Sequence, residues 1–398
     1  MNPPGGPHEE GPGGVQGRKL RVGVIGLGMA GGIMVPVIAG HPQAVLAGAA
    51  DPNAALRARI TADHSIQADE DALQLLQRPD IDAVYIATPH QFHREHVILA
   101  AQHGKHIIVE KPMALTLEDC DAMIAAVRAA GVCMIVGHTH SFDPAVRYMR
   151  EATLAGTWGR LSMIAMWNFT DFLYRPRRPE ELDTSQGGGI LFNQIPHQVD
   201  IARAVAHSPV RTVRAVAGMA DPRRPTEGHC TALIDFESGA AASMVYSGYD
   251  HFDSDELHGW IGGTGRAKQP RHGKTRAAWQ GLKGDEEAAL RQSAYGYGGG
   301  FLSDRPTHQP HFGLIVGSYE QADIRVTPYG VNVYADGGKQ EVALPGASDA
   351  RADVLSELCD AVLRGTAPVH DGVFAKATVA SCLAILESAR SRREVRLD

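Results

Sequence analysis

The chain of 398 residues is longer than one ordinary domain, so we expect two domains, each with a core of its own. Its formal net charge of −7 comes from interspersed acidic and basic residues without a basic stripe, which argues against nucleic acid as a partner. No uninterrupted apolar stretch approaches the roughly 20 residues that cross a bilayer, so we expect no membrane partner either.

The first segment, residues 1–17, is rich in Gly and Pro and has neither the basic start nor the apolar core of a secretory signal. We predict that it is a disordered tail. The five cysteines are an odd number, widely spaced and without a Cys-x-x-Cys pair, which favours buried reduced thiols. These features predict a cytoplasmic protein.

From Lys19 onward, short apolar runs alternate with helical stretches, which is the pattern of parallel strands joined by crossover helices. We predict strands at residues 20–25, 44–50, 83–87, 106–109 and 132–136, and helices at residues 30–39, 54–62, 69–77, 91–102 and 117–130. Residues 18–140 should therefore form an α/β domain with a doubly wound parallel sheet. Its ligand site should lie at the carboxyl ends of the strands.

A glycine-rich motif follows the first predicted strand and reads Gly26, Leu27, Gly28, Met29, Ala30, Gly31. In this context Gly26 permits a tight turn, Gly28 lets the backbone approach a pyrophosphate, and Gly31 lets the helix pack on the strand. The amino terminus of the following helix then receives the phosphates. The motif predicts a dinucleotide site.

Asp51 stands at the end of the second predicted strand, twenty residues after Gly31. A carboxylate there accepts hydrogen bonds from ribose hydroxyls and repels a ribose phosphate, which favours NAD over NADP. Arg57 and Arg59 follow closely and leave NADP open as the less favoured cofactor. The alternative interpretation of Asp51 is a turn or helix-cap residue.

Lys111 lies in the run Glu110-Lys111-Pro112, directly after the predicted strand at residues 106–109. A strand that ends there delivers the lysine to the ligand edge of the sheet, so Lys111 is a candidate catalytic residue. The alternative is a solvated surface lysine, which is the usual position of this residue type.

Several histidines invite a zinc hypothesis, namely His90, His93, His96, His138 and His140. No cysteine or carboxylate completes an evident tetrahedral set with them, so we predict no metal site. His138 and His140, which follow the last parallel strand, are instead expected to line the substrate site.

Residues 141–398 make up the predicted second domain. We expect a helix that ends near Gly156, strands at 161–167, 212–216 and 232–236 and near 324 and 331, and helices at 349–363 and 373–388. Residues 249–310 are irregular and rich in Gly, His and charge. We interpret them as a functional loop over the active site of the same or a neighbouring subunit, with a disordered segment and an oligomer arm as the alternatives.

Residues 187–200 have helical spacing, which puts Asn193, His197 and Asp200 on one face. Pro196 should kink this helix or reset its start. His197 is the candidate base, because the ordinary histidine pKa of about 6.5 lets it take a proton near neutral pH. The alternative is a histidine satisfied by a hydrogen bond in the core.

The segment 167–179 combines aromatic and basic side chains, and its candidate substrate contacts are Trp167, Tyr174, Arg175, Arg177 and Arg178. Aromatic rings offer flat apolar contact, and arginines capture carboxylates through paired hydrogen bonds. This composition predicts a planar, anionic small molecule as substrate. The alternative is a solvated basic loop held by prolines.

Together, the glycine motif, Asp51, the run Thr88-Pro89-His90-Gln91-Phe92-His93 and the run Glu110-Lys111-Pro112 resemble the Gfo/Idh/MocA oxidoreductases from about Lys19 to the end of the chain. The resemblance implies a Rossmann domain followed by an α/β domain with a largely antiparallel open sheet, with the substrate between them over the nicotinamide. It also implies that the bond from Lys111 to Pro112 is often cis.

The resemblance further implies roles for individual residues. Thr88 and Pro89 should lie beside the nicotinamide, and we add His93, Glu110 and Lys111 to the expected cofactor contacts. Lys111 should reach the substrate hydroxyl. His197 maps onto the usual proton-transfer histidine, whereas Asn193 stands where relatives commonly carry aspartate. Because an amide can position a hydroxyl but cannot ionise, proton transfer should rest on His197 and Lys111, with Asn193 as a third catalytic candidate.

Within this family, residues 137–143 and 311–314 are similar to the branch of phthalate cis-dihydrodiol dehydrogenases. We therefore expect an NAD-dependent dehydrogenase that acts on CH-OH or CH-CH groups and oxidises a carboxylated cis-dihydrodiol to the catechol. The alternatives are a sugar or cyclitol dehydrogenase, an NAD-dependent glycosidase and an NAD(H)-sensing protein without activity. We also expect a homo-oligomer, a dimer or tetramer, formed through the C-terminal sheet.

Overall fold

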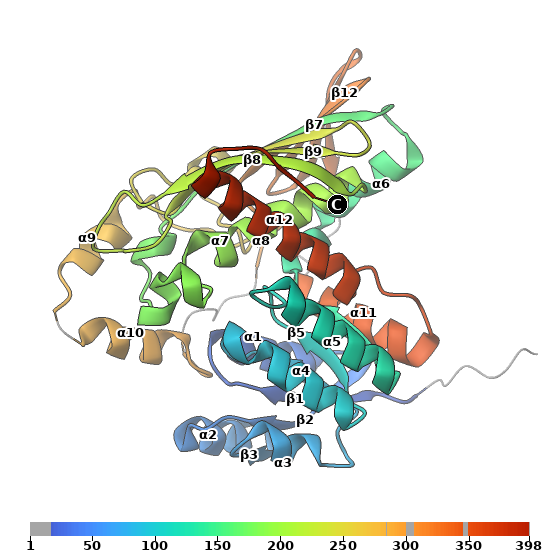
Figure 1. The fold of residues 1–398 in the computed structure, drawn as a ribbon, viewed down its shortest axis with the longest axis vertical. Helices are drawn as coiled ribbons and strands as arrows, with labels where there is room; N and C mark the ends of the chain where they lie inside the picture. The colour runs from blue at the N-terminus through green and yellow to red at the C-terminus, as the bar shows by residue number, and fades with distance from the viewer. Residues whose placement is uncertain (1–16, 284, 300–305, 345–348, 398) are drawn as a thin grey trace, which may run out of the picture.

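The computed structural model describes residues 17–283, 285–299, 306–344 and 349–397, and these form two β-sheets with helices packed on and between them (Figure 1). The predicted disordered tail, residues 1–17, lies outside the described residues except for Gly17.

The first sheet is parallel and has six strands in the order β3-β2-β1-β4-β5-β6. Its elements in chain order are β1 (Leu20–Ile25), α1 (Met29–Gly40), β2 (Ala44–Ala50), α2 (Ala54–His64), β3 (Gln67–Asp69), α3 (Ala72–Leu76), β4 (Ala83–Ile86), η1 (His90–Phe92), α4 (His93–Gln102), β5 (His106–Val109), α5 (Leu117–Ala130), β6 (Met134–Val136) and η2 (Thr139–Phe142). The order reverses between β1 and β4, which confirms the predicted doubly wound fold and puts a ligand site at the carboxyl ends of these strands.

The prediction of a helix over residues 69–77 was wrong at its start. Gln67–Asp69 forms the edge strand β3 beside β2, and the helix α3 begins only at Ala72. The side chain of Asp71 accepts the backbone N–H of Gln74, so this residue caps α3 and separates it from the strand.

The second sheet has nine strands in the order β14-β13-β12-β11-β7-β10-β9-β8-β15. The strands are β7 (Leu161–Phe169), β8 (Val210–Gly218), β9 (His229–Phe236), β10 (Ala241–Ser247), β11 (Leu314–Tyr319), β12 (Ala322–Thr327), β13 (Gly330–Ala335), β14 (Gly338–Ala343) and β15 (Val395–Arg396). Only β7 and β10 pair in parallel among them, so the expected largely antiparallel sheet is confirmed.

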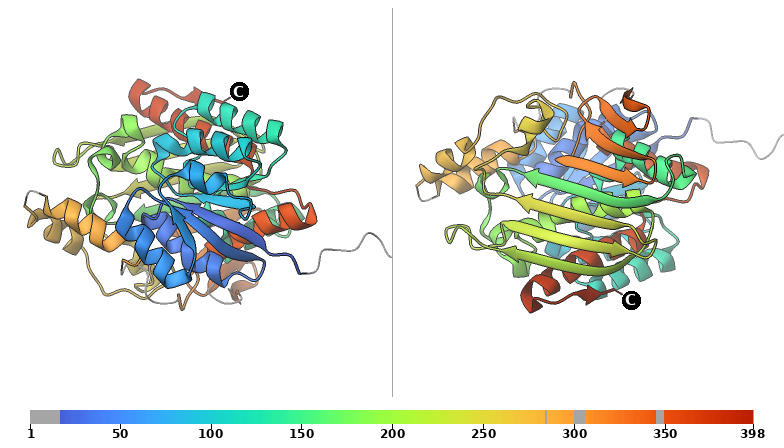
Figure 2. Two further views of the ribbon diagram at one scale, coloured as in Figure 1. Left: turned by 90° about the horizontal axis from the view of Figure 1, so that it is seen from below. Right: turned by 90° about the horizontal axis from the view of Figure 1, so that it is seen from above.

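In the described part of the chain, helices cover one face of this sheet and leave the other without a helix (Figure 2). The helices of the second half are α6 (Pro144–Ala155), α7 (Gly189–Asn193), α8 (Ile195–Ala206), α9 (Lys274–Gln280), α10 (Glu286–Tyr295), α11 (Ala350–Arg364) and α12 (Gly372–Ser391), with short 3-10 turns η3 (Phe172–Tyr174), η4 (Pro179–Leu182), η5 (Thr184–Gln186) and η6 (Ser254–His258). The alternation of buried and exposed residues along β7 separates the covered face from the open one.

The last two helices return to the first sheet. Val354, Leu355 and Leu358 of α11 belong to the apolar core that also contains β1 and α1. The helix α12 lies between the two sheets, with Val379 in the core of the first and Ile385 in that of the second (Figure 1). The predicted domain boundary at residue 140 therefore separates the two halves in sequence only, because helices of the second half also pack against the first sheet.

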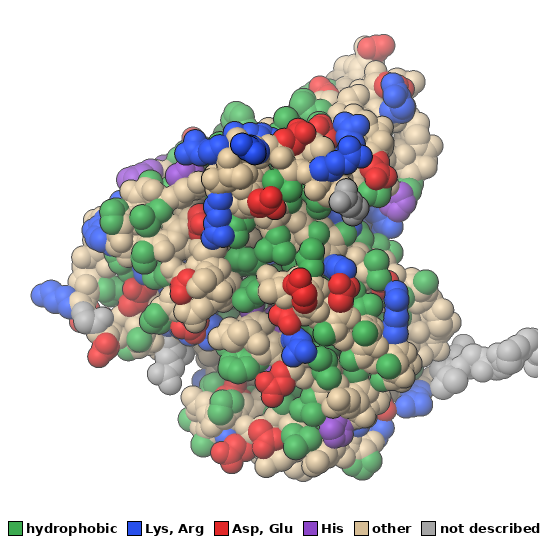
Figure 3. All heavy atoms as spheres, viewed as in Figure 1, with side chains coloured by type: hydrophobic (Ala, Val, Ile, Leu, Met, Phe, Trp, Pro, Cys, Tyr) green, Lys and Arg blue, Asp and Glu red, His purple; other side chains and the backbone are tan. Residues whose placement is uncertain are grey.

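Among the described residues, α12 is the one helix long and apolar enough to cross a membrane by length and composition, and 50% of that apolar window is buried inside the protein. It packs against α5, α8 and β8. On the face drawn in Figure 3, positive and negative side chains are interspersed over both halves of the molecule.

The stretch 249–310, predicted to be irregular, contains η6, α9 and α10 among its described residues. Residues 284 and 300–305 of it lie outside the described part of the chain. Arg224, which is 2% exposed, binds Glu287 of α10 and lies over the ring of Trp279 of α9. A buried guanidinium with a carboxylate partner therefore anchors this arm to the second sheet.

Candidate active site

The glycine motif forms the turn from β1 into α1, and its glycines are required by close contacts. A Cβ atom at Gly31 would lie 1.9 Å from the carbonyl oxygen of Gly26, and one at Gly26, whose φ is +93°, would lie 2.9 Å from the carbonyl oxygen of Ala87. Gly28 differs, because a Cβ there would meet nothing within 4 Å. The open space beside Gly28, at the amino end of α1 where Met29 and Ala30 begin the helix, fits a pyrophosphate.

Asp51 holds the glycine turn from the end of β2. Its carboxylate accepts the backbone N–H of Leu27 at 2.7 Å and that of Asn53 at 2.8 Å. A carboxylate has about four acceptor positions, so these two bonds leave capacity for ribose hydroxyls. Arg57, the possible phosphate contact, donates to the carbonyl oxygens of Asp51 and Pro52 instead.

The loops after β4 and β5 are joined by His93, which was expected to contact the cofactor. Its ring is fully buried, with Nδ1 3.0 Å from the carbonyl oxygen of Pro112 and Nε2 3.0 Å from that of Thr88. The prediction for His93 was therefore wrong, because both nitrogens face backbone carbonyls. Pro89 caps the turn η1 beside it.

Glu110 lies at the carboxyl end of β5 and is held by its neighbours. Its carboxylate accepts the hydroxyl of Tyr85, and the backbone N–H of Lys111 lies 3.3 Å from its second oxygen. Burial, together with the nearby Glu110 charge, raises the pKa of Tyr85 well above its usual value, so Tyr85 stays a donor. Glu110 thus braces the backbone that carries Lys111.

Lys111 reaches from the first sheet to the second half of the chain. Its Nζ donates to the carbonyl oxygen of Asn193 at 2.9 Å, and the peptide bond to Pro112 is cis. Burial lowers the pKa of its ammonium, the Glu110 charge opposes this shift, and Arg177 adds to it. Lys111 is therefore not the solvated surface lysine of the alternative interpretation.

The predicted helix over residues 187–200 is two helices with a break at Gln194, and Pro196 lies in the first turn of α8. Asn193 ends α7, whereas His197 and Asp200 belong to α8. The prediction that all three share one helix face was therefore wrong. The amide nitrogen of Asn193 donates to the carbonyl oxygens of Gly187 and Gly189. The side-chain amide of Asn193 thus holds the turn at Gly187 and Gly189, whereas its backbone carbonyl oxygen positions Lys111.

Histidines from two elements meet beside this break. The ring centroids of His140 on η2 and His197 on α8 are 4.9 Å apart, and the two rings are nearly perpendicular. Phe312 packs against both rings. His140 has a carboxylate partner, because its Nδ1 lies 2.8 Å from Oδ2 of Asp143. The pairing with Asp143 and the contact with Phe312 were not predicted from the sequence.

His138 is buried behind this pair. Its Nδ1 lies 3.9 Å from a carboxylate oxygen of Asp200, and both side chains are 1% exposed. Neither ring nitrogen of His138, nor either oxygen of Asp200, has a hydrogen-bond partner among the described residues. Burial lowers the pKa of His138 although the Asp200 charge opposes this.

The three candidate arginines have different surroundings. Arg175 is 35% exposed and its Nε donates to Asp171, while no partner for its two terminal nitrogens is found in the described part of the chain. Arg177 donates to the carbonyl oxygen of Phe172 and lies 3.8 Å above the ring of that residue. Arg178 is more exposed and pairs with acidic residues of its own turn. Arg175 therefore offers a free pair of donors.

Two predicted substrate contacts were wrong. Trp167 is 52% exposed and lies on the open face of the second sheet, because strand alternation turns Met166 and Asn168 toward the covered face. Tyr174 is buried, and its hydroxyl donates to Asp221 at 2.8 Å. That hydrogen bond joins η3 to the loop between β8 and β9, and the ring of Tyr174 also packs against Trp279 of α9, so Tyr174 has a packing role.

Tyr297, in the arm, contacts the cofactor turn and was missed. Its backbone N–H donates to the carbonyl oxygen of Leu27, its hydroxyl donates to Asp63 of α2, and its Cα would lie 3.0 Å from a Cβ at Gly32. The only signal in the sequence was an aromatic residue between Gly296 and Gly298. The segment 249–310, through Tyr297, therefore packs against the turn that is expected to hold the pyrophosphate.

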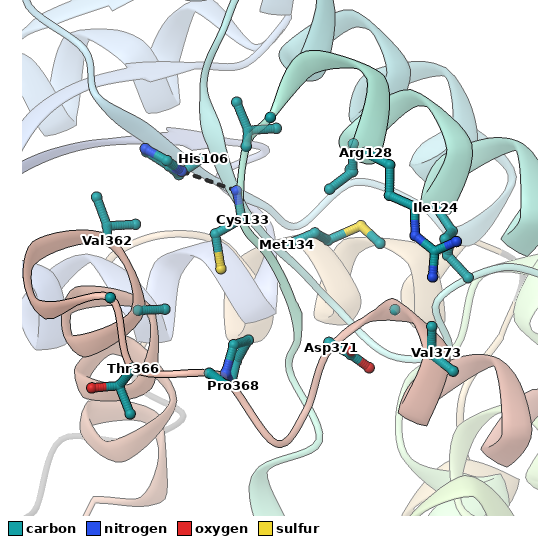
Figure 4. A pocket seen from close by; sticks show the side chains of 17 residues that line it. His106, Ile124, Arg128, Cys133, Met134, Val362, Thr366, Pro368, Asp371 and Val373 are labelled. Carbon is teal, nitrogen blue, oxygen red and sulfur yellow. Dashed lines mark hydrogen bonds between the residues drawn. The ribbon is translucent and has the colours of Figure 1, made fainter.

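One open hollow of about 460 Å³ lies elsewhere, at the amino ends of β5 and β6 beside α11 (Figure 4). His106, Cys133 and Asp371 are on its wall. Ligands of doubly wound sheets bind at the carboxyl ends of the strands, so we do not assign this hollow to the cofactor. Within the described ranges, no group of three or more His, Cys, Asp or Glu residues has an arrangement that could hold a metal ion.

A glycine turn with space for a pyrophosphate, an acid at the end of β2 and a lysine at the end of β5 define an NAD-binding oxidoreductase. Comparisons with known proteins agree. The family model of Gfo/Idh/MocA oxidoreductases with an NAD-binding Rossmann fold matches residues 20–138, and the model of their C-terminal domain matches residues 146–267. The chain belongs to the Gfo/Idh/MocA family.

Relatives of this chain span nearly its whole length. The 1-carboxy-3-chloro-3,4-dihydroxycyclo hexa-1,5-diene dehydrogenase of Comamonas testosteroni is 41% identical, over 93% of this chain and 95% of the relative. A crystal structure from Bordetella bronchiseptica RB50 is 48% identical with a TM-score of 0.92, covering 95% of this chain and 100% of that one. The scyllo-inositol 2-dehydrogenase (NAD(+)) of Bacillus subtilis is 32% identical over 58% of this chain and 67% of the relative.

Proposed function

We propose that this NAD-dependent dehydrogenase oxidises a cyclohexadiene cis-diol that carries one or two carboxylates, and that the product is the catechol. The observation that carries the proposal is Arg175, whose terminal nitrogens have no partner among the described residues. Its charge acts on Tyr246, which is a neighbour of Phe312 and Gln194. The diene dehydrogenase of Comamonas testosteroni, named for a carboxylated dihydroxycyclohexadiene, supports the same substrate class.

In the proposed mechanism the glycine turn and Asp51 would hold NAD, which would supply the hydride acceptor. Lys111, kept in place by the carbonyl oxygen of Asn193, stabilises negative charge that develops on the substrate oxygen. The alcohol proton passes to a histidine beside Lys111, for which the sequence favours His197. Arg175 orients the ring of the substrate through its carboxylate.

A substrate panel tests the proposal. Purified protein with NAD is offered carboxylated cis-dihydrodiols, scyllo-inositol, free sugars and aryl glycosides, and NADH and catechol are measured. We expect NADH with the carboxylated diols only. NADH with a neutral cyclitol alone would select a cyclitol dehydrogenase, and sugar release without net NADH would select a glycosidase. Tight NADH binding without any turnover would select a sensing protein.

Replacement of Arg175 by glutamine is expected to raise the KM for a carboxylated diol by about 10- to 100-fold, because a charge-assisted hydrogen bond contributes about 1.5–3 kcal/mol. Asp171 keeps its partner Arg271, so the fold should persist. Steady-state kinetics measure the change, with Arg160→Gln as control, because Arg160 also pairs with a carboxylate but is exposed. An unchanged KM would remove Arg175 from the substrate site.

We also propose a homo-oligomer formed through the open face of the second sheet. Met163, Trp167 and Leu233 are about half exposed there, on β7 and β9, the two strands that flank β10. Asp323 and Arg325 on β12 point to the same face, so two copies can offer each other opposite charges.

The oligomer prediction is tested by light scattering after size exclusion. Trp167→Asp is expected to convert the oligomer to monomer with an unchanged circular dichroism spectrum, because it buries an uncompensated charge in the contact. Leu154→Asp, an equally exposed site on α6, is the control and should leave the oligomer intact. A monomeric wild type, or an unaffected Trp167 variant, would contradict the interface.

The proposed location is the cytoplasm. All five cysteines are free, and burial raises the pKa of the Cys133 thiol to about 11 and that of Cys120 to about 12. Free thiols are typical of reducing compartments.

A further inference from the structure

His140 has the geometry of an oriented base. It lies on η2, directly after the parallel sheet, and its Nδ1 is 2.8 Å from Oδ2 of Asp143. The Asp143 side chain is 2% exposed, whereas the His140 side chain is 19% exposed. An ionised carboxylate only accepts hydrogen bonds, so Nδ1 donates and Nε2 is left as the acceptor. In enzymes that use a histidine as base, a buried carboxylate bonded to one ring nitrogen commonly fixes the orientation of the ring, and Asp143 is placed to do this for His140.

His197 lacks such support. Its Nδ1 is buried and has no hydrogen-bond partner in the described part of the chain. Burial lowers its pKa well below the usual value, and the charges of Lys111 and His140 add to this. Protonation of His197 would therefore put a positive charge on a buried ring beside the Lys111 ammonium, with no carboxylate to compensate it.

We infer that His140, oriented by Asp143, is the base that takes the substrate's hydroxyl proton, and that His197 stays neutral and positions that hydroxyl. This inference rests on the proposed function, an alcohol oxidation. The carbon–hydrogen bond breaks and its electron pair passes to NAD, the oxygen–hydrogen bond breaks and the proton passes to Nε2 of His140, and a carbon–oxygen double bond forms. The substrate is oxidised and NAD is reduced.

The groups around His140 come from five elements. Asp143 follows it on the same turn, His197 faces it from α8, and His311 lies within electrostatic reach ahead of β11. Arg147 of α6 and Arg351 of α11 act on Asp143. Burial raises the pKa of the Asp143 carboxyl, while His140 and Arg147 oppose that shift. Asp143 acts through the ring of His140 and is a positioning residue.

Nitrogen NMR of labelled histidines tests the orientation without substrate or cofactor. At neutral pH the wild-type His140 ring is expected to carry its proton on Nδ1, with the signals assigned by their loss in His140→Asn. In Asp143→Asn, the amide can donate to Nδ1, so the proton should move to Nε2. A wild-type ring protonated on Nε2 alone would overturn the inference, because its one acceptor nitrogen, Nδ1, would then face Asp143 and not the substrate.

Kinetics test the role in turnover. His140→Asn is expected to lower kcat by about 10²- to 10⁴-fold, the usual contribution of a general base, with a much smaller change in KM. Asp143→Asn should lower kcat similarly, because the carboxylate that orients the ring and compensates its positive charge is gone. Asp353→Asn, which removes the carboxylate paired with Arg147, is the control and should retain kcat.

The outcomes separate this inference from the proposed function. If the wild type oxidises a different alcohol, the same variants are measured with that alcohol, and the NMR result is unaffected. If His197→Asn abolishes kcat while His140→Asn retains it, His197 is the base and the inference is wrong. NAD binding, measured by quenching of protein fluorescence, should be equal in all variants, and its loss in His140→Asn would place this residue in the cofactor site instead.

Discussion

Lys111→Ala is expected to lower kcat by about 10³-fold while NAD binding changes little. The partly buried ammonium lies at the carboxyl end of β5, where its charge would stabilise the substrate oxygen as negative charge develops on it. Its Nζ donates to Asn193 of the second half, so the loss also removes a link across the active site. Single-turnover kinetics measure hydride transfer directly, and calorimetry measures NAD binding.

A matched variant separates chemistry from fold for this lysine. Lys376→Ala removes the same charge from α12, where the ammonium pairs with Asp121 at the surface, and should leave kcat unchanged. If the Lys111→Ala protein keeps a tenth of the wild-type kcat or more, Lys111 does not stabilise charge on the substrate oxygen and only helps to position the substrate. Loss of NAD binding in Lys111→Ala would assign the lysine to the cofactor rather than to the substrate.

Gly31→Ala is expected to abolish detectable NAD binding and to lower thermal stability. The new Cβ would lie 1.9 Å from the carbonyl oxygen of Gly26, so the turn must open where it approaches the pyrophosphate. Gly28→Ala should separate the two effects, because its Cβ meets no protein atom within 4 Å but enters the space expected for the pyrophosphate. We expect that variant to fold normally and to bind NAD at least about 100-fold more weakly.

The control for both glycine variants is Gly40→Ala at the end of α1, where a Cβ has no neighbour within 4 Å. Thermal unfolding measures stability, and calorimetry measures the Kd for NAD. Wild-type NAD affinity in Gly28→Ala would place the pyrophosphate elsewhere on the chain.

The parallel sheet was predictable almost residue by residue. Strands β1, β2 and β5 have the expected limits, because each is a short apolar run bounded by turn residues and buried on both faces. The edge strand β3 escaped prediction, because three residues of mixed polarity have no period. In the second half, β14 was missed because its residues are mostly exposed and form no apolar run. The strand β11 was missed although it begins with the apolar run Leu314-Ile315-Val316.

The candidate site was predictable where its residues are close together in the chain. The glycine turn and Lys111 follow strands directly, so their position at the ligand edge follows from topology. Trp167 was misplaced because composition does not say which face of a strand is covered. The three arginines were equivalent in sequence, and only their neighbours Asp171, Phe172 and Glu181 distinguish them.

The sequence by itself determined the nucleotide fold, the preference for NAD and the lysine after β5, because these depend on local patterns and on the order of parallel strands. The tertiary structure alone decided which histidine has a carboxylate partner, and it brought Lys111 to Asn193, 82 positions apart in the chain. It also placed the arm of Tyr297 against the carbonyl oxygen of Leu27. Contacts between distant segments depend on how helices pack around both sheets, and no local pattern encodes that packing.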